Sequence, residues 1–169
     1  MKRILLVGHT ASGKTTLCQR LNGLERTHKK TQAIEVINGT IDTPGEYLEH
    51  RSFFRGLVVT SVEVDLVLFV QDATAERFVF SPSQATAFPV PVAGVVTKTD
   101  IASQVQCRRA VELLELAGAT PIFCVSAVSG TGLDRLLRFL EWDRAPREQW
   151  SSAKEGLPAQ DIALTVDKH

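Results

Sequence analysis

The sequence predicts an α/β domain in which helices cover a mostly parallel sheet on both faces. Short, continuously apolar runs recur along about the first 140 residues, as expected of strands buried on both sides. Residues with helical apolar spacing follow most of these runs, and strands that alternate with helices are typical of parallel sheets. With 169 residues, the chain has the size of one domain.

The expected elements follow one another from residue 4 onward. A strand at 4–7 enters a glycine-rich turn and then a helix over 14–22. Alternating residues before Asn38-Gly39 predict a hairpin, whose first strand, near 33–37, is the antiparallel edge of a six-stranded sheet. Its partner is expected at 40–42, further strands at 65–70, 90–96 and 122–125, and further helices at 51–61, 101–117 and 133–142.

Two segments do not follow this alternation. Residues 73–88 predict only a short helix, with Ser81 as its N-cap and Pro82 at its first position. From residue 143 to 169 the composition changes to Arg, Glu, Ser, Lys, Gly, Pro and Gln. We therefore expect one folded domain over 1–142 and a flexible tail over 143–169.

Composition and charge exclude several classes of function. The 19 Lys and Arg residues balance the 19 Asp and Glu residues, so the chain lacks the positive field of a general nucleic-acid binder. Its apolar runs are much shorter than the roughly 20 residues that cross a bilayer, and its N-terminal run is too short for a secretory signal. A cytoplasmic protein with no membrane span is expected. The three cysteines have neither zinc-site nor disulfide spacing.

The strongest motif lies between the first strand and the first helix. Residues 8–15 read GHTASGKT, which is the phosphate-loop pattern in its expected context. Backbone N–H groups and the helix N-terminus would surround phosphates, Lys14 would reach the β- and γ-phosphates, and the Thr15 hydroxyl would bind Mg²⁺. The candidate nucleotide contacts in this loop are Gly8, His9, Thr10, Ala11, Ser12, Gly13, Lys14, Thr15 and Thr16.

Three shorter motifs follow the ends of later strands. Asp42-Thr43-Pro44-Gly45 ends the hairpin, Thr97-Lys98-Thr99-Asp100 ends the strand at Val96, and Ser126-Ala127 follows the last strand. The carboxyl ends of parallel strands form the ligand-facing rim of an open α/β sheet. Asp42 is therefore a candidate magnesium ligand, and Gly45, Thr97, Lys98, Asp100, Ser126 and Ala127 are candidate nucleotide contacts.

In this order, the motifs resemble those of the Ras-like branch of P-loop GTPases. The resemblance covers residues 1 to about 142 and implies a three-layer fold with a six-stranded sheet. It also implies that Asp100 pairs with the guanine edge while Lys98 packs along the base. Adenine would leave such a carboxylate unpaired, which favours GTP over ATP. The commoner Asn of this element is Thr97 here.

A narrower resemblance is to the EutP/PduV family of ethanolamine- and propanediol-utilisation microcompartments. It rests on MKRILLVG, GKTTL, KKTQAIEV, IDTPGEYLEH and TKTD. The resemblance implies a cytoplasmic bacterial protein that works beside a metabolic shell, with shell proteins as partners. Members of this family are described both as GTPase-like proteins and as acetate kinases that use ATP, so GTP, ATP and acetate all remain candidate ligands.

Residues around the phosphates suggest slow hydrolysis by the isolated protein. Thr31 is the candidate for the mobile-loop threonine that completes magnesium coordination, although it could instead begin the edge strand. Glu46 replaces the usual water-orienting Gln; as a catalytic candidate, its carboxylate could hold the attacking water, but it would also repel the γ-phosphate. Thr10 replaces a glycine in the loop. His9 either meets the γ-phosphate or a second substrate, or faces solvent.

Three functions therefore stay open. The first is a Mg²⁺-dependent, guanine-preferring nucleotide hydrolase or switch. The second is phosphoryl transfer from ATP to acetate, for which Arg51, Arg55 and His9 are candidate carboxylate contacts. The third is a shell-associated scaffold that binds nucleotide without useful turnover, through the tail or through a basic cluster of Arg26, His28, Lys29 and Lys30. The oligomeric state is left open.

Overall fold

The computed structural model describes residues 3–23, 35–48 and 50–142. They form a six-stranded sheet with the order β2-β3-β1-β4-β5-β6. Strand β2 pairs antiparallel with β3, and every other neighbouring pair is parallel. The predicted sheet, with one antiparallel edge strand, is confirmed. The strands are β1 (Ile4–Val7), β2 (Glu35–Ile37), β3 (Thr40–Asp42), β4 (Leu66–Asp72), β5 (Val92–Thr97) and β6 (Ile122–Cys124).

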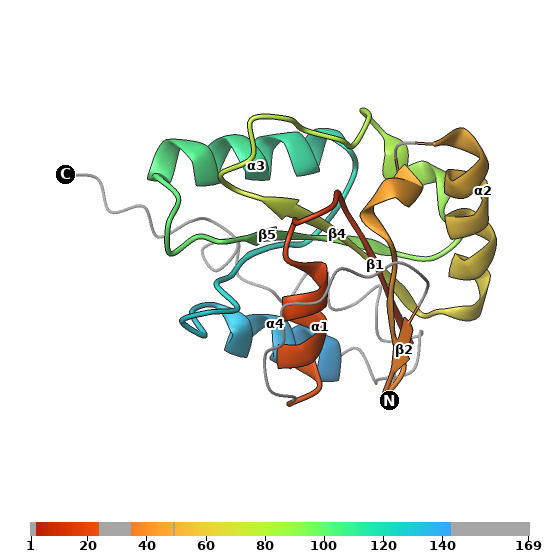
Figure 1. Ribbon diagram of the computed structural model, residues 1–169, viewed down its shortest axis with the longest axis horizontal. Helices are drawn as coiled ribbons and strands as arrows, with labels where there is room; N and C mark the ends of the chain where they lie inside the picture. Colours follow the sequence, from red (N-terminus) through yellow and green to blue (C-terminus); the bar gives the residue numbers. More distant parts are fainter. Residues whose placement is uncertain (1–2, 24–34, 49, 143–169) are drawn as a thin grey trace.

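Helices cover both faces of this sheet, as Figure 1 shows. On one face lie α2 (Arg51–Thr60) and α3 (Gln104–Leu116), and on the other α1 (Lys14–Leu21) and α4 (Leu133–Trp142). The side chains of β1 alternate between the two faces, because successive residues of a strand point to opposite sides. Leu5 and Val7 pack in the core under α2 and α3, while Ile4 and Leu6 pack in the core under α1 and α4. The three-layer arrangement is therefore built on two separate hydrophobic cores.

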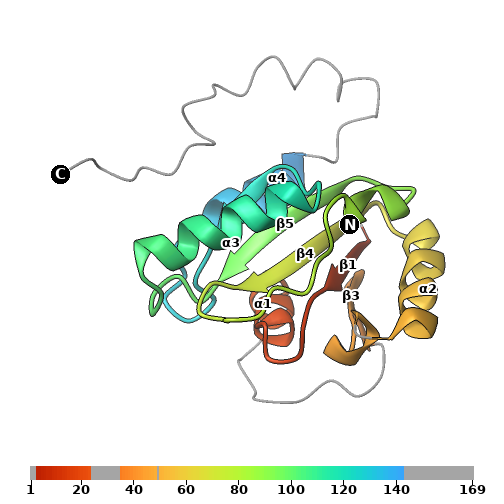
Figure 2. The ribbon, with the colours of Figure 1, turned by 90° about the horizontal axis from the view of Figure 1, so that it is seen from above.

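The segment after β4 departs from the strand–helix alternation. It contains only a 3-10 turn, η3 (Gln84–Ala87), and it crosses the face between α2 and α3 (Figure 2). The rings of Phe69 and Phe80 stack with centroids 4.3 Å apart, and Phe88 meets Phe69 edge-on at 5.6 Å. Aromatic side chains thus cover this part of the sheet.

The predicted short helix in this segment exists, but its predicted start was wrong. The turn begins at Gln84 and not at Pro82, and Ser83 precedes it with a left-handed backbone, φ 59°. The N–H of Ser83 donates to the Leu116 carbonyl at 2.9 Å, so a contact with α3 fixes where the turn begins. The Ser-Pro signal is local and does not contain this tertiary contact.

Other element boundaries moved by a few residues. Helix α3 begins at Gln104 because Ser103 and Gln106 form a reciprocal capping box. Strand β4 extends through Gln71 and Asp72, two polar residues that ended the expected apolar run. No helix in the described part of the chain is both long and apolar enough to cross a membrane. The predicted tail at 143–169, the basic cluster and Thr31 lie outside the described residues.

Candidate nucleotide site

The predicted motifs meet at the carboxyl edge of the sheet. The phosphate loop follows β1, Asp42 is the last residue of β3, Thr97 is the last residue of β5, and Ser126 lies just after β6. Strand pairing fixes these positions, since Leu6 is opposite Asp42. The sheet thus places all four motifs on one rim, as predicted from the parallel topology.

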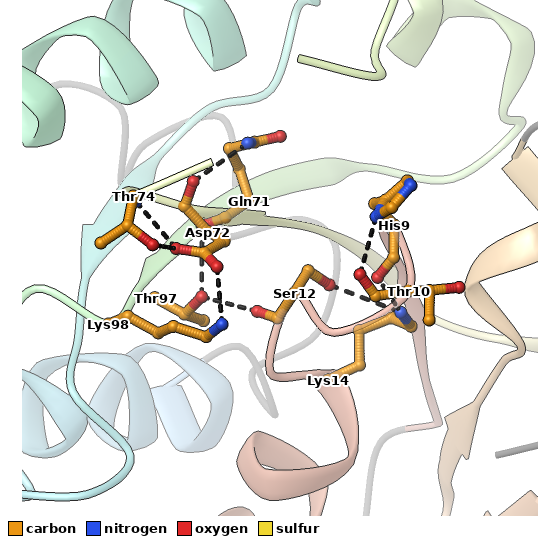
Figure 3. A network of polar contacts seen from close by, with 9 residues as sticks. All are labelled: His9, Thr10, Ser12, Lys14, Gln71, Asp72, Thr74, Thr97 and Lys98. Atoms are coloured by element: carbon orange, nitrogen blue, oxygen red, sulfur yellow. Dashed lines mark hydrogen bonds and ion pairs between the residues drawn. The ribbon is translucent and has the colours of Figure 1, made fainter. Parts of the chain in front are cut away.

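The phosphate loop wraps around the side chain of Lys14. The Lys14 Nζ donates to the carbonyl oxygen of Gly8 at 2.8 Å. It also donates to that of His9 at 2.7 Å, and Figure 3 shows Lys14 beside His9. Ala11 and Gly13 have positive φ angles of 63° and 90°, which turn the loop into the first helix. At Gly8 a Cβ atom would lie 2.3 Å from the Val70 carbonyl oxygen, so no side chain fits there. The loop therefore packs directly on β4.

Burial alters the protonation of Lys14. Only 5% of the residue is exposed, and burial lowers the pKa of its ammonium from 10.5 to about 8, although the nearby Asp42 carboxylate acts in the opposite direction. A buried cation is costly without a counter-charge. An anion bound in the loop would supply that charge and favour the protonated lysine.

This shift predicts that phosphate binding weakens in mild alkali. Below pH 8 Lys14 is charged before binding, and above it the free protein must take up a proton when phosphate binds. We expect the affinity for GDP to fall about tenfold between pH 7 and pH 9. Calorimetric titration should show no comparable slope for Lys14→Arg, whose charge does not titrate. Parallel pH profiles for the two proteins would contradict this assignment.

The predicted magnesium ligands face each other next to this loop. The Thr15 Oγ1 donates to Asp42 Oδ2 at 2.7 Å, and Asp42 is only 1% exposed. One hydroxyl and one carboxylate, together with phosphate oxygens and water, suit Mg²⁺, which usually keeps several waters. The donor set on these two residues therefore fits the ion. The third candidate ligand, Thr31, lies outside the described residues.

Gly45 brings the second motif against the phosphate loop. A Cβ atom at this buried glycine would lie 2.0 Å from the Thr10 backbone nitrogen, so the two backbones are in direct contact. Glu46 follows it in the turn η1 (Gly45–Leu48) and is exposed. His9 lies in the loop with its Nδ1 2.7 Å from the Thr10 carbonyl oxygen. Thr10 and Gly45 are therefore neighbours, and Glu46 directly follows Gly45 in the chain.

The motif after β5 is tied to the phosphate loop by Thr97. Its hydroxyl donates to the Ser12 carbonyl oxygen at 2.6 Å (Figure 3). The residue is only 2% exposed. The Lys98 Nζ forms an ion pair with Asp72 Oδ2 at 2.6 Å. Asp100 is exposed on the turn in which the Ile101 N–H donates to the Lys98 carbonyl. The threonine at the usual asparagine position thus makes a cross-link between the two halves of the site.

The loop after β6 is braced from two sides. The Ser129 N–H donates to the buried Ser126 Oγ at 3.0 Å. Arg20 of α1 donates from Nε to the Ala127 carbonyl oxygen at 2.7 Å and from Nη2 to that of Val128 at 3.1 Å. The helix that begins at the phosphate loop therefore also holds the Ser-Ala loop.

Two residues of this arrangement were missed by the sequence analysis. Asp72 follows a buried apolar run just as Asp100 does, so the strand-end rule could have found it. Arg20 gives no such signal, because its partners lie 107 and 108 residues away along the chain.

Comparison with known proteins places this chain in a family. A family model described as "Ethanolamine utilisation - propanediol utilisation", PduV-EutP, matches residues 1–142. The propanediol utilization protein PduV of Citrobacter freundii is 41% identical over 140 residues, which are 83% of this chain and 93% of the relative. A probable acetate kinase EutP of Escherichia coli K12 is 32% identical over 145 residues, or 83% of this chain and 89% of that protein.

Solved structures agree on the fold. A point variant of Aquifex aeolicus Era bound to GDP·AlF4⁻ superimposes with a TM-score of 0.58 at 24% identity, over 83% of this chain and 56% of Era. Elongation factor SelB of Methanococcus maripaludis with GPPNHP gives a TM-score of 0.59 at 22% identity, over 82% of this chain and 32% of SelB. The chain thus spans about half of Era and a third of SelB. With the phosphate loop in place on the fold of P-loop GTPases, the chain belongs to the PduV-EutP family.

Proposed function

We propose that this protein is a Mg²⁺-dependent, guanine-preferring nucleotide-binding protein of propanediol or ethanolamine utilisation. The single observation that supports it best is the 2.6 Å hydrogen bond from Thr97 to the Ser12 carbonyl. It joins the motif that would read the base to the loop that would hold the phosphates. One nucleotide spanning both motifs would use them together.

Each half of the site has its own task in this proposal. Lys14 and the N–H groups of residues 8–15 bind the β- and γ-phosphates, and Thr15 and Asp42 hold Mg²⁺, which neutralises phosphate charge. Asp100 accepts hydrogen bonds from the guanine edge, and the stem of Lys98 lies along the base. Ser126 and Ala127 line the other side of the base.

Hydrolysis by the isolated protein is expected to be slow. A carboxylate at Glu46 repels the γ-phosphate, and Thr10 adds a side chain at the loop position in contact with Gly45. We expect fewer than about one turnover per minute, in the range of unassisted P-loop GTPases. Many turnovers per second from the purified chain would contradict this part of the proposal.

The deciding experiment is calorimetric titration with non-hydrolysable GTP and ATP analogues. In Mg²⁺ we expect at least tenfold tighter binding of the GTP analogue, and weaker binding of both in EDTA. Asp100→Ala should abolish the preference for GTP, because the carboxylate that discriminates the bases is gone. Glu112→Ala, which removes an exposed acid from the far half of α3, is the matched control and should keep it. Equal or tighter ATP binding that Asp100→Ala leaves unchanged would overturn guanine preference.

That overturning result would favour the second candidate, phosphoryl transfer from ATP to acetate. The observation behind it is the 32% identity to the probable acetate kinase EutP. Of the candidate carboxylate contacts, Arg55 is exposed on α2, and the His9 ring contacts the Thr10 carbonyl of the phosphate loop. The structure does not describe the side chain of Arg51. Formation of acetyl phosphate from ATP and acetate, trapped as the hydroxamate, would identify this activity. Tight nucleotide binding with neither reaction would instead fit the scaffold hypothesis, and fluorescent tagging would then test for placement at a microcompartment shell.

A further inference from the structure

Asp72 is held in place from both sides of its carboxylate. Its Oδ1 accepts hydrogen bonds from the Thr74 N–H at 2.8 Å and the Thr74 hydroxyl at 2.7 Å, and its Oδ2 accepts from Lys98 Nζ at 2.6 Å (Figure 3). The side chain is 13% exposed. Burial alone would raise its pKa, but the bonds from Lys98 and Thr74 outweigh burial and leave the pKa below its usual value. Asp72 is therefore a fixed, ionised anchor.

The backbone of Lys98, next to this anchor, has an uncommon conformation. Its φ angle is +60°, in the left-handed region that non-glycine residues rarely adopt. Asp72 and Thr97 are paired across β4 and β5, so the anchor stands directly beside the residue that precedes Lys98. The ion pair fixes the end of a long side chain whose stem would otherwise sample many rotamers.

From these contacts we infer that Asp72 is a positioning residue for the base side of the nucleotide site. By binding the Lys98 ammonium, Asp72 holds the hydrocarbon stem of Lys98 in one conformation already in the nucleotide-free protein, where it can line the base site. The charge of Lys98 is then matched within the protein, so Lys98 offers the base an apolar surface and does not act as a second phosphate-binding cation. This inference rests on the proposed function, in which the stem of Lys98 lies along the base.

A double-mutant cycle on the full chain, with GDP and Mg²⁺ as the probe, tests this inference. Asp72→Asn keeps the shape of the side chain but replaces a carboxylate oxygen by an amide and removes the charge that holds Lys98. We expect calorimetry to show at least a fivefold loss of GDP affinity. Glu76→Gln, which removes the same charge from an exposed site on the same loop, should bind GDP within twofold of the unmodified chain.

The same Asp72→Asn change, made in a chain that already carries Lys98→Met, distinguishes positioning of Lys98 from a general effect of Asp72 on its loop. Lys98→Met retains an apolar stem but has no ammonium for Asp72 to hold. In that background, Asp72→Asn should weaken GDP binding by less than a further twofold. A purely structural role, closing the turn at Thr74, would lower affinity and melting temperature by similar amounts in both backgrounds.

The outcomes also distinguish this inference from the proposed function. If the unmodified chain binds GDP and Asp72→Asn binds it equally well, or if the loss is the same in both backgrounds, the positioning role of Asp72 is overturned and the proposed function stands. If the unmodified chain binds no guanine nucleotide, both fail. If Asp72→Asn loses GDP affinity when Lys98 is present but not when it is replaced by methionine, the inference is supported.

Discussion

Replacing Lys14 by methionine is expected to lower nucleotide affinity at least a hundredfold without lowering the melting temperature. The ammonium is the charged donor inside the phosphate loop, and charge-assisted bonds to phosphate are among the strongest in proteins. Two such bonds, each worth about 1.5–3 kcal/mol, account for a loss of this size. Stability does not follow affinity, because burial already disfavours the charged lysine and lowers its pKa to about 8. Calorimetry and thermal unfolding on the same samples measure both quantities.

Arg108→Met is the matched control for the loss of one positive charge. Arg108 is exposed on α3, and the variant should bind nucleotide like the unmodified chain. If Lys14→Met binds GDP with full affinity, Lys14 is not the phosphate-binding cation. If it unfolds at a markedly lower temperature, the loop depends on its ammonium for its own structure.

Gly8→Ala is expected to destabilise the fold by about 2–4 kcal/mol, a large effect for one methyl group. The added Cβ would lie 2.3 Å from the Val70 carbonyl and 2.8 Å from Ser12 Oγ, and a backbone group of a central strand cannot move aside cheaply. For a domain of this size, the melting temperature should fall by roughly 5–15 °C.

Gly56→Ala is a control for which we expect the opposite change in folding stability. Gly56 lies within α2, and a Cβ there would have no heavy atom within 4 Å apart from its chain neighbours and the backbone of its own helix. The same glycine-to-alanine change should stabilise the helix by about 0.5–1 kcal/mol, because alanine loses less conformational freedom in a helix. Equal melting temperatures for the two variants would show that the phosphate loop does not pack on β4 as closely as described.

The sequence predicts best the features that depend on neighbouring residues. Continuously apolar runs marked the central strands, Asn38-Gly39 marked the hairpin, and the glycine pattern marked the phosphate loop. The parallel topology then placed the motifs on one rim without any knowledge of contacts. These rules act over a few residues, or follow from how strand ends align.

Features that depend on distant contacts could not be predicted in this way. The hydrogen bond from Thr97 to Ser12 joins residues 85 apart, and nothing near Thr97 in the sequence indicates its partner. The aromatic cover of β4 depends on Phe80 stacking against Phe69, which no period of apolar residues encodes. The same holds for the start of η3, which a contact with α3 determines.

Because the side chains of β1 pack into two different cores, they limit how this sequence can diverge during evolution. None of its four residues is more than 4% exposed, and each of them packs in one core or the other. Substitution is therefore restricted on both faces of the strand that carries the phosphate loop, and its four positions should accept only apolar replacements of similar volume. At the sheet margin, Val36 of β2 is 66% exposed and is free of that restriction. Related sequences should therefore differ most in the hairpin strand β2, at the edge of the sheet, and least in β1.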